Sequence, residues 1–190
     1  MRQERATSSA CLHRNGQSRH GHRVTDDPLQ HCFPPVVGTD TRLLILGSLP
    51  GVASLAAGRY YAHPRNQFWR LLETVIDAPL EPLAYEERLG ALLARGVGLW
   101  DTVAAARRRG SLDADIRLEA PSDLCGLLAT LPELRAIAFN GGTAARIGRL
   151  QLEEAERWAL IDLPSSSPAF TLPFQTKAES WERLRPYLKP

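Results

Sequence analysis

Short apolar runs alternate with longer amphipathic segments from residue 41 to the end of the chain. A brief apolar run bounded by turn-forming residues is typical of a buried strand, whereas apolar residues that recur every three or four positions indicate a helix. The runs predict four strands, at residues 42–47, 97–101, 135–139 and 157–163. The amphipathic segments predict five helices, at residues 64–76, 84–95, 122–131, 142–150 and 176–188.

Residues at the ends of three predicted helices support these boundaries. Ser122 precedes one helix, Gly141 and Gly142 open another, and Gly96 closes a third. Strands that alternate with helices favour a parallel sheet covered on both faces. The predicted fold class is therefore α/β: a three-layer α/β/α sandwich with a central, mainly parallel four-stranded sheet.

The first 38 residues have no hydrophobic periodicity, are rich in Arg, His, Ser and Gly, and end in "FPPVVG". We predict a flexible N-terminal tail over residues 1–38 and one domain over residues 39–190. The tail also holds six potential zinc ligands, but their spacing matches no established zinc module. These six residues are Cys11, His13, His20, His22, His31 and Cys32.

Composition excludes several classes of protein. The chain is 44% apolar and 23% charged, which is ordinary for a globular protein. Its apolar runs are far shorter than the roughly 20 residues that cross a membrane, and no secretory signal is recognisable. The three cysteines form no CxxC pair. We expect a soluble, cytoplasmic monomer without disulfides, metal or other cofactor.

The net charge of +2 conceals a local excess of arginine in the first 32 residues, beyond which basic and acidic residues are equal in number. Any affinity for nucleic acid must therefore come from local patches. Three arginines beside the predicted helix at 64–76, Arg59, Arg65 and Arg70, offer such charge, as do Arg107, Arg108, Arg109 and Arg146. A run of arginines is equally compatible with a solvated face.

In open parallel sheets, functional loops follow the carboxyl ends of the strands. The loops after the four predicted strands contain "GSLPG", "DTVAAARRRGSLD", "NGGTAAR" and "PSSSPAF", which are rich in small and polar residues. We expect the four loops to form one site. Glycine and proline in "GSLPG" bring backbone atoms close to a ligand, which favours Gly47, Ser48 and Pro50 as contact residues.

Two familiar enzyme motifs are missing. A phosphate-binding loop of the Walker type needs a Lys-Ser/Thr pair, and the only lysines are Lys177 and Lys189. The GxSxG motif of a nucleophile elbow is also absent. A hydrolytic triad of Ser48, His63 and Asp101 is conceivable, because His63 is the only histidine of the predicted domain.

Six segments in order, "ILGSLPG", "YYAHPRNQFW", "GVGLWDTV", "RRRGSLDADI", "FNGGTAA" and "LPSSSPA", together resemble the hypoxanthine-DNA glycosylase family of the uracil-DNA glycosylase superfamily. The resemblance covers residues 40–188 and implies a uracil-DNA glycosylase-like fold. It makes Asn66 the catalytic residue, whose amide holds a water; a helix-capping role is the alternative. Where related first loops carry a polar residue that supports the water, this chain has Leu49.

The resemblance also implies a base-recognition site. Asn140, at a predicted strand end, would read the edge of the base, or else form the turn before two glycines. Asp101 takes the place of a base-reading asparagine; it would accept a hydrogen bond from the base or cap its own turn. Among Tyr60, Tyr61 and Phe68, we favour Phe68 as the ring that stacks on the extruded base. Gly47 and Ser48 complete the site.

The segment "LPSSSPAF" is the second DNA-binding element that the resemblance implies. Ser165, Ser166, Ser167 and Pro168 would contact phosphates together with Pro50 and Arg65, and Phe170 would fill the gap left by the extruded nucleotide.

The predicted function is base-excision repair by a monofunctional glycosylase, which hydrolyses the N-glycosidic bond of hypoxanthine in DNA. Uracil and xanthine are further candidate bases. No lysine lies in a predicted site loop, so no Schiff base is expected. Two alternatives stay open: a catalytically inactive nucleic-acid-binding protein of the same fold, and a nucleoside or ester hydrolase for small molecules.

Overall fold

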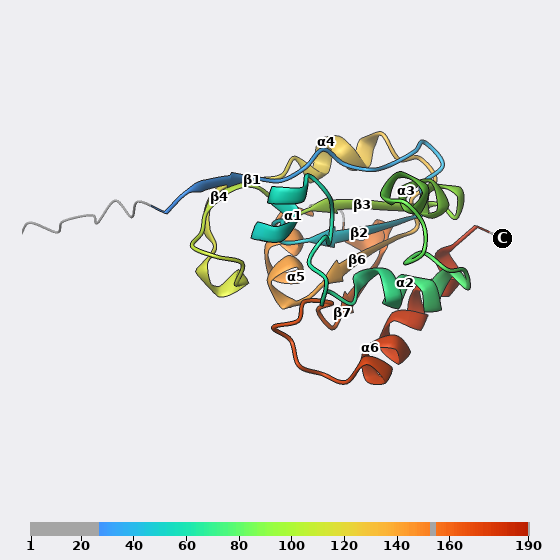
Figure 1. Ribbon diagram of the computed structural model, residues 1–190. Helices are drawn as coiled ribbons and strands as arrows, with labels where there is room; N and C mark the ends of the chain where they lie inside the picture. The colour runs from blue at the N-terminus through green and yellow to red at the C-terminus, as the bar shows by residue number, and fades with distance from the viewer. Residues whose placement is uncertain (1–26, 153–154, 190) are drawn as a thin grey trace, which may run out of the picture.

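A four-stranded parallel sheet forms the centre of the molecule in the computed structural model, which describes residues 27–152 and 155–189 (Figure 1). Its strands follow the order β3-β2-β6-β7. They are β2 (Leu43–Gly47), β3 (Val97–Asp101), β6 (Ala136–Asn140) and β7 (Ala159–Leu163). The four predicted strands and their parallel arrangement are confirmed, with boundaries that shift by two residues or fewer.

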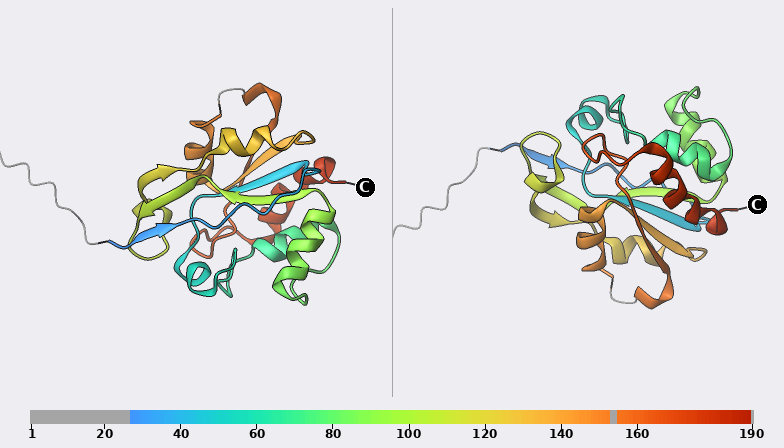
Figure 2. Two further views of the ribbon diagram at one scale, coloured as in Figure 1. Left: turned by 90° about the horizontal axis from the view of Figure 1, so that it is seen from above. Right: turned by 90° about the horizontal axis from the view of Figure 1, so that it is seen from below.

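Helices cover both faces of this sheet, so the predicted three-layer α/β/α architecture is also confirmed (Figure 2). On one face lie α2 (Phe68–Ile76), α3 (Tyr85–Ala94) and α6 (Phe174–Trp181). The other face is covered by α4 (Leu124–Ala129) and α5 (Gly142–Arg149). Successive side chains of a strand point to opposite faces, and β2 accordingly sends Leu43 and Ile45 to the first layer, Leu44 and Leu46 to the second.

Local chemistry explains where the helices begin and end. The N-cap of α4 is Asp123 rather than the predicted Ser122: its carboxylate accepts a hydrogen bond from Gly126 N at 2.9 Å. Gly141 precedes α5 with φ of 101°, and a Cβ there would lie 3.0 Å from Ser165 Cβ. Glycine thus lets α5 start against the loop that follows β7. The predicted helix at 176–188 is α6 followed by a 3₁₀ helix (Glu182–Tyr187) that contains Pro186.

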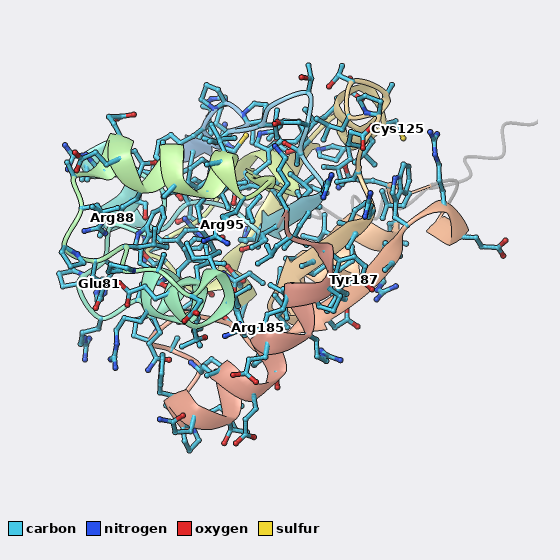
Figure 3. All side chains as sticks on the ribbon, turned by 90° about the vertical axis from the view of Figure 1, so that its right-hand side faces the viewer. Glu81, Arg88, Arg95, Cys125, Arg185 and Tyr187 are labelled. Atoms are coloured by element: carbon cyan, nitrogen blue, oxygen red, sulfur yellow. The ribbon has the colours of Figure 1, made fainter. Side chains whose placement is uncertain are left out.

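Figure 3 shows the end of the molecule where the strands begin, with the C-terminal segment packed across it. Arg185 donates a hydrogen bond to Thr74 O of α2, and Lys189 N donates to Arg95 O at 3.0 Å. Tyr187 packs against the first core layer. Among the described residues, no helix is both long enough and apolar enough to span a membrane.

A second, antiparallel sheet was not predicted. It has the order β1-β4-β5, with β1 (Leu29–His31), β4 (Val103–Arg107) and β5 (Arg117–Pro121). The sequence concealed these strands because β1 is only three residues long, β4 reads "VAAAR", and β5 is exposed along most of its length. Three shorter elements are new as well: helix α1 (Val52–Ala57) and the 3₁₀ helices Asp113–Asp115 and Ala155–Arg157.

The described end of the predicted tail is part of the fold. Besides the pairing of β1 with β4, Val36 forms a bridge with Leu99, and Trp100 Nε1 donates to Phe33 O at 3.0 Å. These contacts use mostly backbone atoms, which leave no periodic pattern in the sequence. The ordered unit therefore begins before Thr39. Of the six potential zinc ligands, only His31 and Cys32 lie in the described part, where no group of three metal-ligating side chains occurs.

β1 is held to the rest of the molecule by a fully buried arginine. The guanidinium of Arg108 donates from Nε and Nη2 to Gln30 Oε1, at 3.1 and 2.7 Å, and also from Nη2 to Pro50 O. Gln30 Nε2 returns a bond to Arg108 O at 3.3 Å. Burial lowers the pKa of Arg108, and the Asp113 carboxylate opposes this shift. One side chain thus joins β1, the loop after β2 and the hairpin that β4 and β5 form, residues 103–121.

Gln30→Ala should destabilise the fold by about 3 kcal/mol, because it leaves a buried guanidinium without its main partner. Urea unfolding, followed by the fluorescence of the four tryptophans, measures the change. His31→Ala is the matched control: His31 lies on the exposed side of the same strand, so its loss should cost within about 0.5 kcal/mol. Equal stabilities of the two variants would contradict the role given to Gln30.

Candidate functional site

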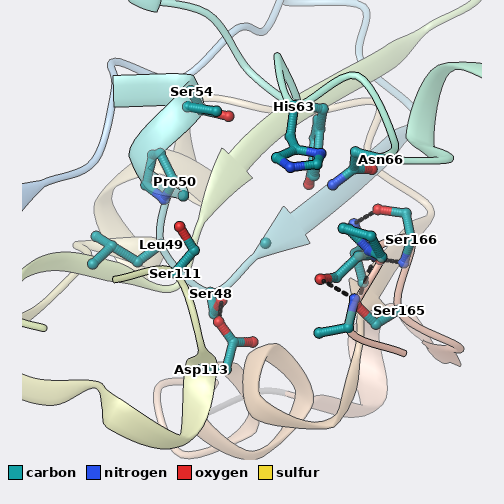
Figure 4. Close-up of a pocket in the computed structure, with 18 of the residues that line it drawn as sticks. Ser48, Leu49, Pro50, Ser54, His63, Asn66, Ser111, Asp113, Ser165 and Ser166 are labelled. Carbon is teal, nitrogen blue, oxygen red and sulfur yellow. Dashed lines mark hydrogen bonds between the residues drawn. The ribbon is translucent and has the colours of Figure 1, made fainter. Parts of the chain in front are cut away.

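The loops at the carboxyl ends of the parallel strands converge on one pocket of about 380 Å³, as the sequence predicts (Figure 4). The walls come from the loops at residues 47–51, 60–66, 111–113 and 165–169, and from the last residues of β3 and β6. Most of the predicted site residues line it: Gly47, Ser48, Pro50, Arg65, Asn66, Asp101, Asn140, Ser165, Ser166, Ser167 and Pro168. Phe68 and Phe170 are not among the lining residues.

Asn66 lies in the loop immediately before α2, with its side chain at the pocket wall (Figure 4). Its Oδ1 accepts a hydrogen bond from Phe68 N at 3.0 Å, so Asn66 is tied to the first residue of α2, although the N-cap of that helix is Gln67. This bond fixes the orientation of the amide. An amide oxygen has two lone pairs, and Nδ2 has no partner among the described residues. Both atoms can therefore still bind a water or a substrate.

Asn140 ends β6 and is tied to the serine-rich loop by a reciprocal pair of hydrogen bonds. Its Nδ2 donates to Ser166 Oγ at 2.9 Å, and Ser166 N donates to its Oδ1 at 2.8 Å. Gln67 N donates to Ser166 O at 3.0 Å and so connects the Asn66 segment to the same loop. Asn140 thus positions the loop as well as lining the pocket, and its side chain also interacts with the Tyr61 hydroxyl.

Asp101 is the least satisfied polar group of the pocket. Only 3% of the residue is exposed, and Oδ2 has no hydrogen-bond partner. Burial, and secondly the Asp113 carboxylate, raise the pKa of Asp101 to about 7, although the Arg108 guanidinium acts in the opposite direction. The carboxyl lies directly above Gly47, where a Cβ would come within 2.4 Å of Oδ1. A larger residue at position 47 would displace Asp101.

Ser48 is engaged with the hairpin and not with a histidine. Its hydroxyl donates to Asp113 Oδ1 at 2.7 Å, and the Nδ1 atom of His63 accepts from Arg65 N at 3.1 Å. Burial raises the pKa of Asp113, while the bond from Ser48 acts against this. Ser48, His63 and Asp101 all line the pocket, but the hydrogen-bond chain that activates a serine is missing from the described structure.

Tyr60 and Tyr61 line the pocket and Phe68 does not, so the choice of Phe68 is wrong. Phe68 is fully buried in the first core layer and stacks on Tyr61, with ring centroids 3.6 Å apart and planes 9° apart. The start of an amphipathic helix faces the core, whereas Tyr61 lies in the preceding loop with φ of 54°. Its hydroxyl reaches the floor near Gly47, and burial raises its pKa.

Phe170 lies on the rim, next to the lining residue Ala169, and is 46% exposed. Its backbone is fixed at both polar atoms. Phe170 N donates to Ser167 O at 3.1 Å, and Phe170 O accepts from Lys177 Nζ at 2.7 Å. Burial lowers the pKa of Lys177, whose side chain is almost fully enclosed. An exposed apolar ring on a fixed backbone suits the predicted insertion into DNA.

The three consecutive arginines lie in different environments, so the run is neither one continuous basic patch nor one uniformly solvated face. Arg107 pairs with Glu119 at 3.1 Å, Arg108 is buried, and Arg109, whose side chain is 88% exposed, pairs with Asp27 at 3.5 Å. Arg65 is different: it is exposed and lies at the pocket wall.

Leu49 packs with Val103, Ala106 and Ile147 in a small separate core, which accounts for an apolar residue at this position.

Several lining residues were not anticipated, namely Ser54, His63 in a role outside a triad, Ser111, Leu112 and Asp113. Because His63 lies only three residues before Asn66, the sequence already indicates that His63 can reach the same pocket. Ser111, Leu112 and Asp113 reach the pocket only because the hairpin folds back over the loop after β2. Three carboxylate, imidazole or thiol groups do not cluster anywhere in the described chain, so no metal site is indicated there.

Comparisons with known proteins agree with this architecture. The family model described as "Uracil DNA glycosylase superfamily" matches residues 34–189. The protein named "Hypoxanthine DNA glycosylase" of Methanosarcina acetivorans is 39% identical over 152 residues, covering 80% of this chain and 95% of the relative.

A protein of the same name from Methanosarcina barkeri is 43% identical over 109 residues, covering 57% of this chain and 69% of the relative. The solution NMR structure of a candidate uracil DNA glycosylase from Methanosarcina acetivorans superimposes with a TM-score of 0.75 at 37% identity. The match covers 84% of this chain and 99% of that one.

Asp101→Asn should stabilise the protein at high pH. The pKa of Asp101 is about 7 in the folded protein, against an ordinary value of 3.8. Between about pH 4 and pH 7 the carboxyl is therefore deprotonated in the unfolded chain but still protonated in the folded one, and the wild type loses stability as the pH rises through this range. The neutral amide avoids this loss, so the variant should gain about 2 to 4 kcal/mol at about pH 8 and nothing near pH 4.

Urea unfolding across this pH range measures the gain. The matched control is Asp115→Asn, which removes an exposed carboxyl of the same hairpin and should give no pH-dependent gain. A gain by Asp101→Asn that is equal at all pH values would contradict the explanation.

Proposed function

Because the chain belongs to the uracil DNA glycosylase superfamily, we propose that it removes hypoxanthine from DNA by hydrolysing the N-glycosidic bond, leaving an abasic site. The chain is a DNA glycosylase; the identity of the base and the roles of the residues are the proposed part. The observation that carries the proposal is the convergence of Asn66, Asp101 and Asn140 on one pocket. The two relatives named for hypoxanthine support the choice of base.

Asn66 positions the water that attacks the sugar. Its amide is held by Phe68 N and keeps a free lone pair on Oδ1 and a free donor on Nδ2. An amide is too weak a base to ionise water, but a weak nucleophile suffices once the base has begun to leave and the sugar carries positive charge. Leu49 points into its own core, which leaves the water to Asn66.

The floor of the pocket reads the base. Hypoxanthine offers N1–H as a donor and O6 and N7 as acceptors. The ionised carboxyl of Asp101 accepts from N1–H, whereas the neutral carboxyl donates to an acceptor. Asn140 contributes its amide, which a base would reach by replacing its interaction with the Tyr61 hydroxyl, and Gly47 and Ser48 add backbone groups. Tyr61 lies against the plane of the base, supported from behind by the stacked ring of Phe68.

The rim grips the DNA strand. Pro50, Arg65, Ser165, Ser167 and Pro168 contact phosphates and sugars, which fixes the strand without reading its sequence. Ser166 is 1% exposed, so it serves through its bonds to Asn140. Phe170 enters the space that the extruded nucleotide vacates.

The proposed setting is the cytoplasm, where the protein acts as a monomer on DNA that contains a deaminated base. Cys32 and Cys125 form no disulfide in the described structure, in keeping with a reducing compartment. Uracil and xanthine remain further candidate substrates, because they also result from deamination.

Asn66→Ala should reduce excision of hypoxanthine at least about a hundredfold, equivalent to about 2.7 kcal/mol of barrier. The assay is alkaline cleavage of labelled oligonucleotides that carry one deoxyinosine or one deoxyuridine, incubated in EDTA. The matched control is Asp123→Ala, which likewise removes a side chain that accepts a backbone N–H at the start of a helix and should cost about 1 kcal/mol of stability without reducing excision.

The same assay separates the alternatives. Binding of the oligonucleotide without excision by the wild type would refute glycosylase activity and favour an inactive binding protein. Faster hydrolysis of free deoxyinosine than of the oligonucleotide would favour a small-molecule hydrolase. Loss of excision in EDTA would show that the reaction needs a metal ion.

A further inference from the structure

The pocket carries one large, exposed apolar side chain, that of Leu112. Leu112 is 54% exposed and lines the pocket, at the turn between β4 and β5. It is one of six large apolar residues that are exposed in the described structure, the others being Leu29, Val52, Leu118, Leu150 and Phe170. Of these six, Leu112 alone is a lining residue. Leu112 is therefore exposed at the pocket that is proposed to bind DNA.

The residues on both sides of Leu112 are fixed to the loop after β2. Ser111 Oγ accepts from Val52 N at 2.9 Å, and Asp113 Oδ1 accepts from Ser48 Oγ at 2.7 Å. Leu112 O accepts from Asp115 N at 3.1 Å, which closes a short 3₁₀ helix. Three successive residues are thus held by polar bonds, Ser111 and Asp113 through their side chains and Leu112 through its carbonyl oxygen. The side chain of Leu112 is left out of these bonds and belongs to none of the core clusters.

The tip of the hairpin combines an apolar side chain with positive charge. Arg108 is buried, whereas the Arg109 side chain is 88% exposed and pairs with Asp27 at 3.5 Å. Leu112 is the exposed apolar residue of the tip, with the partnered Ser111 and Asp113 beside it. Phe170 provides a second exposed apolar group next to the pocket, on the loop after β7.

Removing one nucleotide from a duplex exposes the faces of the neighbouring bases and leaves a gap. Apolar side chains that enter such a gap replace the lost stacking and slow the return of the base. We propose that Leu112 inserts into the duplex next to the extruded nucleotide, so that the β4–β5 hairpin is a second insertion element besides the loop that carries Phe170. This inference rests on the proposed action on a base in duplex DNA.

The first test compares Leu112→Ala with the wild type on one deoxyinosine sequence, both single-stranded and as a duplex opposite cytosine. Under single-turnover conditions, we expect the duplex rate to fall at least about tenfold and the single-strand rate to change less than about twofold. Leu112→Met should retain the duplex rate, because it keeps an apolar side chain of similar size. Leu118→Ala is the matched control: Leu118 is 49% exposed on β5 of the same hairpin, away from the pocket lining.

Equal losses on both substrates would overturn the proposal, because Leu112 would then act on the base or the fold rather than on the duplex. An unchanged duplex rate would overturn it as well.

A second readout does not depend on excision. A 2-aminopurine placed beside the deoxyinosine becomes brighter when stacking is lost, so binding of the wild type or Leu118→Ala should raise its fluorescence. Leu112→Ala, at saturating protein, should give less than about half of that rise. An equal rise with Leu112→Ala, or none with the wild type, would refute insertion by Leu112. If the wild type gives the rise but excises nothing, the proposed function fails while the insertion stands.

Discussion

The buried guanidinium of Arg108 is the interaction on which the arrangement of the site depends. An arginine without access to water is costly unless its charge and its donors have partners. Here Gln30 from the first strand and the carbonyl of Pro50 from the loop after β2 bind Nε and Nη2, while Nη1 makes no hydrogen bond within the described part of the chain and lies 4.0 Å from the Asp113 carboxylate. Three segments far apart in the sequence must therefore meet around one side chain. Where they meet, the loop and the hairpin together form one wall of the pocket.

The opposite wall is held by amides that serve two purposes. Asn140 is bound twice to Ser166, and Asn66 is bound to the first backbone N–H of α2. Gln67 N, bonded to Ser166 O, joins these two positions. Side chains that already have fixed partners keep their orientation when a substrate arrives, and pre-organised groups of this kind lower the cost of reaching the transition state. The structural bonds of both asparagines are thus compatible with a functional role.

The elements of the central sheet were predictable because each is encoded locally. Apolar runs predict β2, β3, β6 and β7, and the rule that parallel strands end at one edge of the sheet places Gly47, Asp101 and Asn140 at one site. The sequence does not predict β1, the second sheet or the approach of the hairpin to the pocket, because contacts between distant segments decide the positions of these elements. β1 owes its position to Arg108, 78 residues away, and the hairpin tip reaches the pocket through Ser48. The prediction of Phe68 as the stacking ring is wrong because the sequence does not show which of several neighbouring aromatic rings faces the core.

If Asp101 reads the base as proposed, its burial explains how the site would discriminate between bases. Its carboxyl is buried against Gly47, and Oδ2 lacks a partner in the described structure. A base that supplies the missing hydrogen bond removes the penalty of a buried, unpaired polar group, whereas a base that cannot leaves the penalty in place. Polar sites of this kind reject the wrong ligand much more strongly than apolar pockets do. The same unsatisfied carboxyl that weakens the empty fold therefore favours a base whose edge complements it.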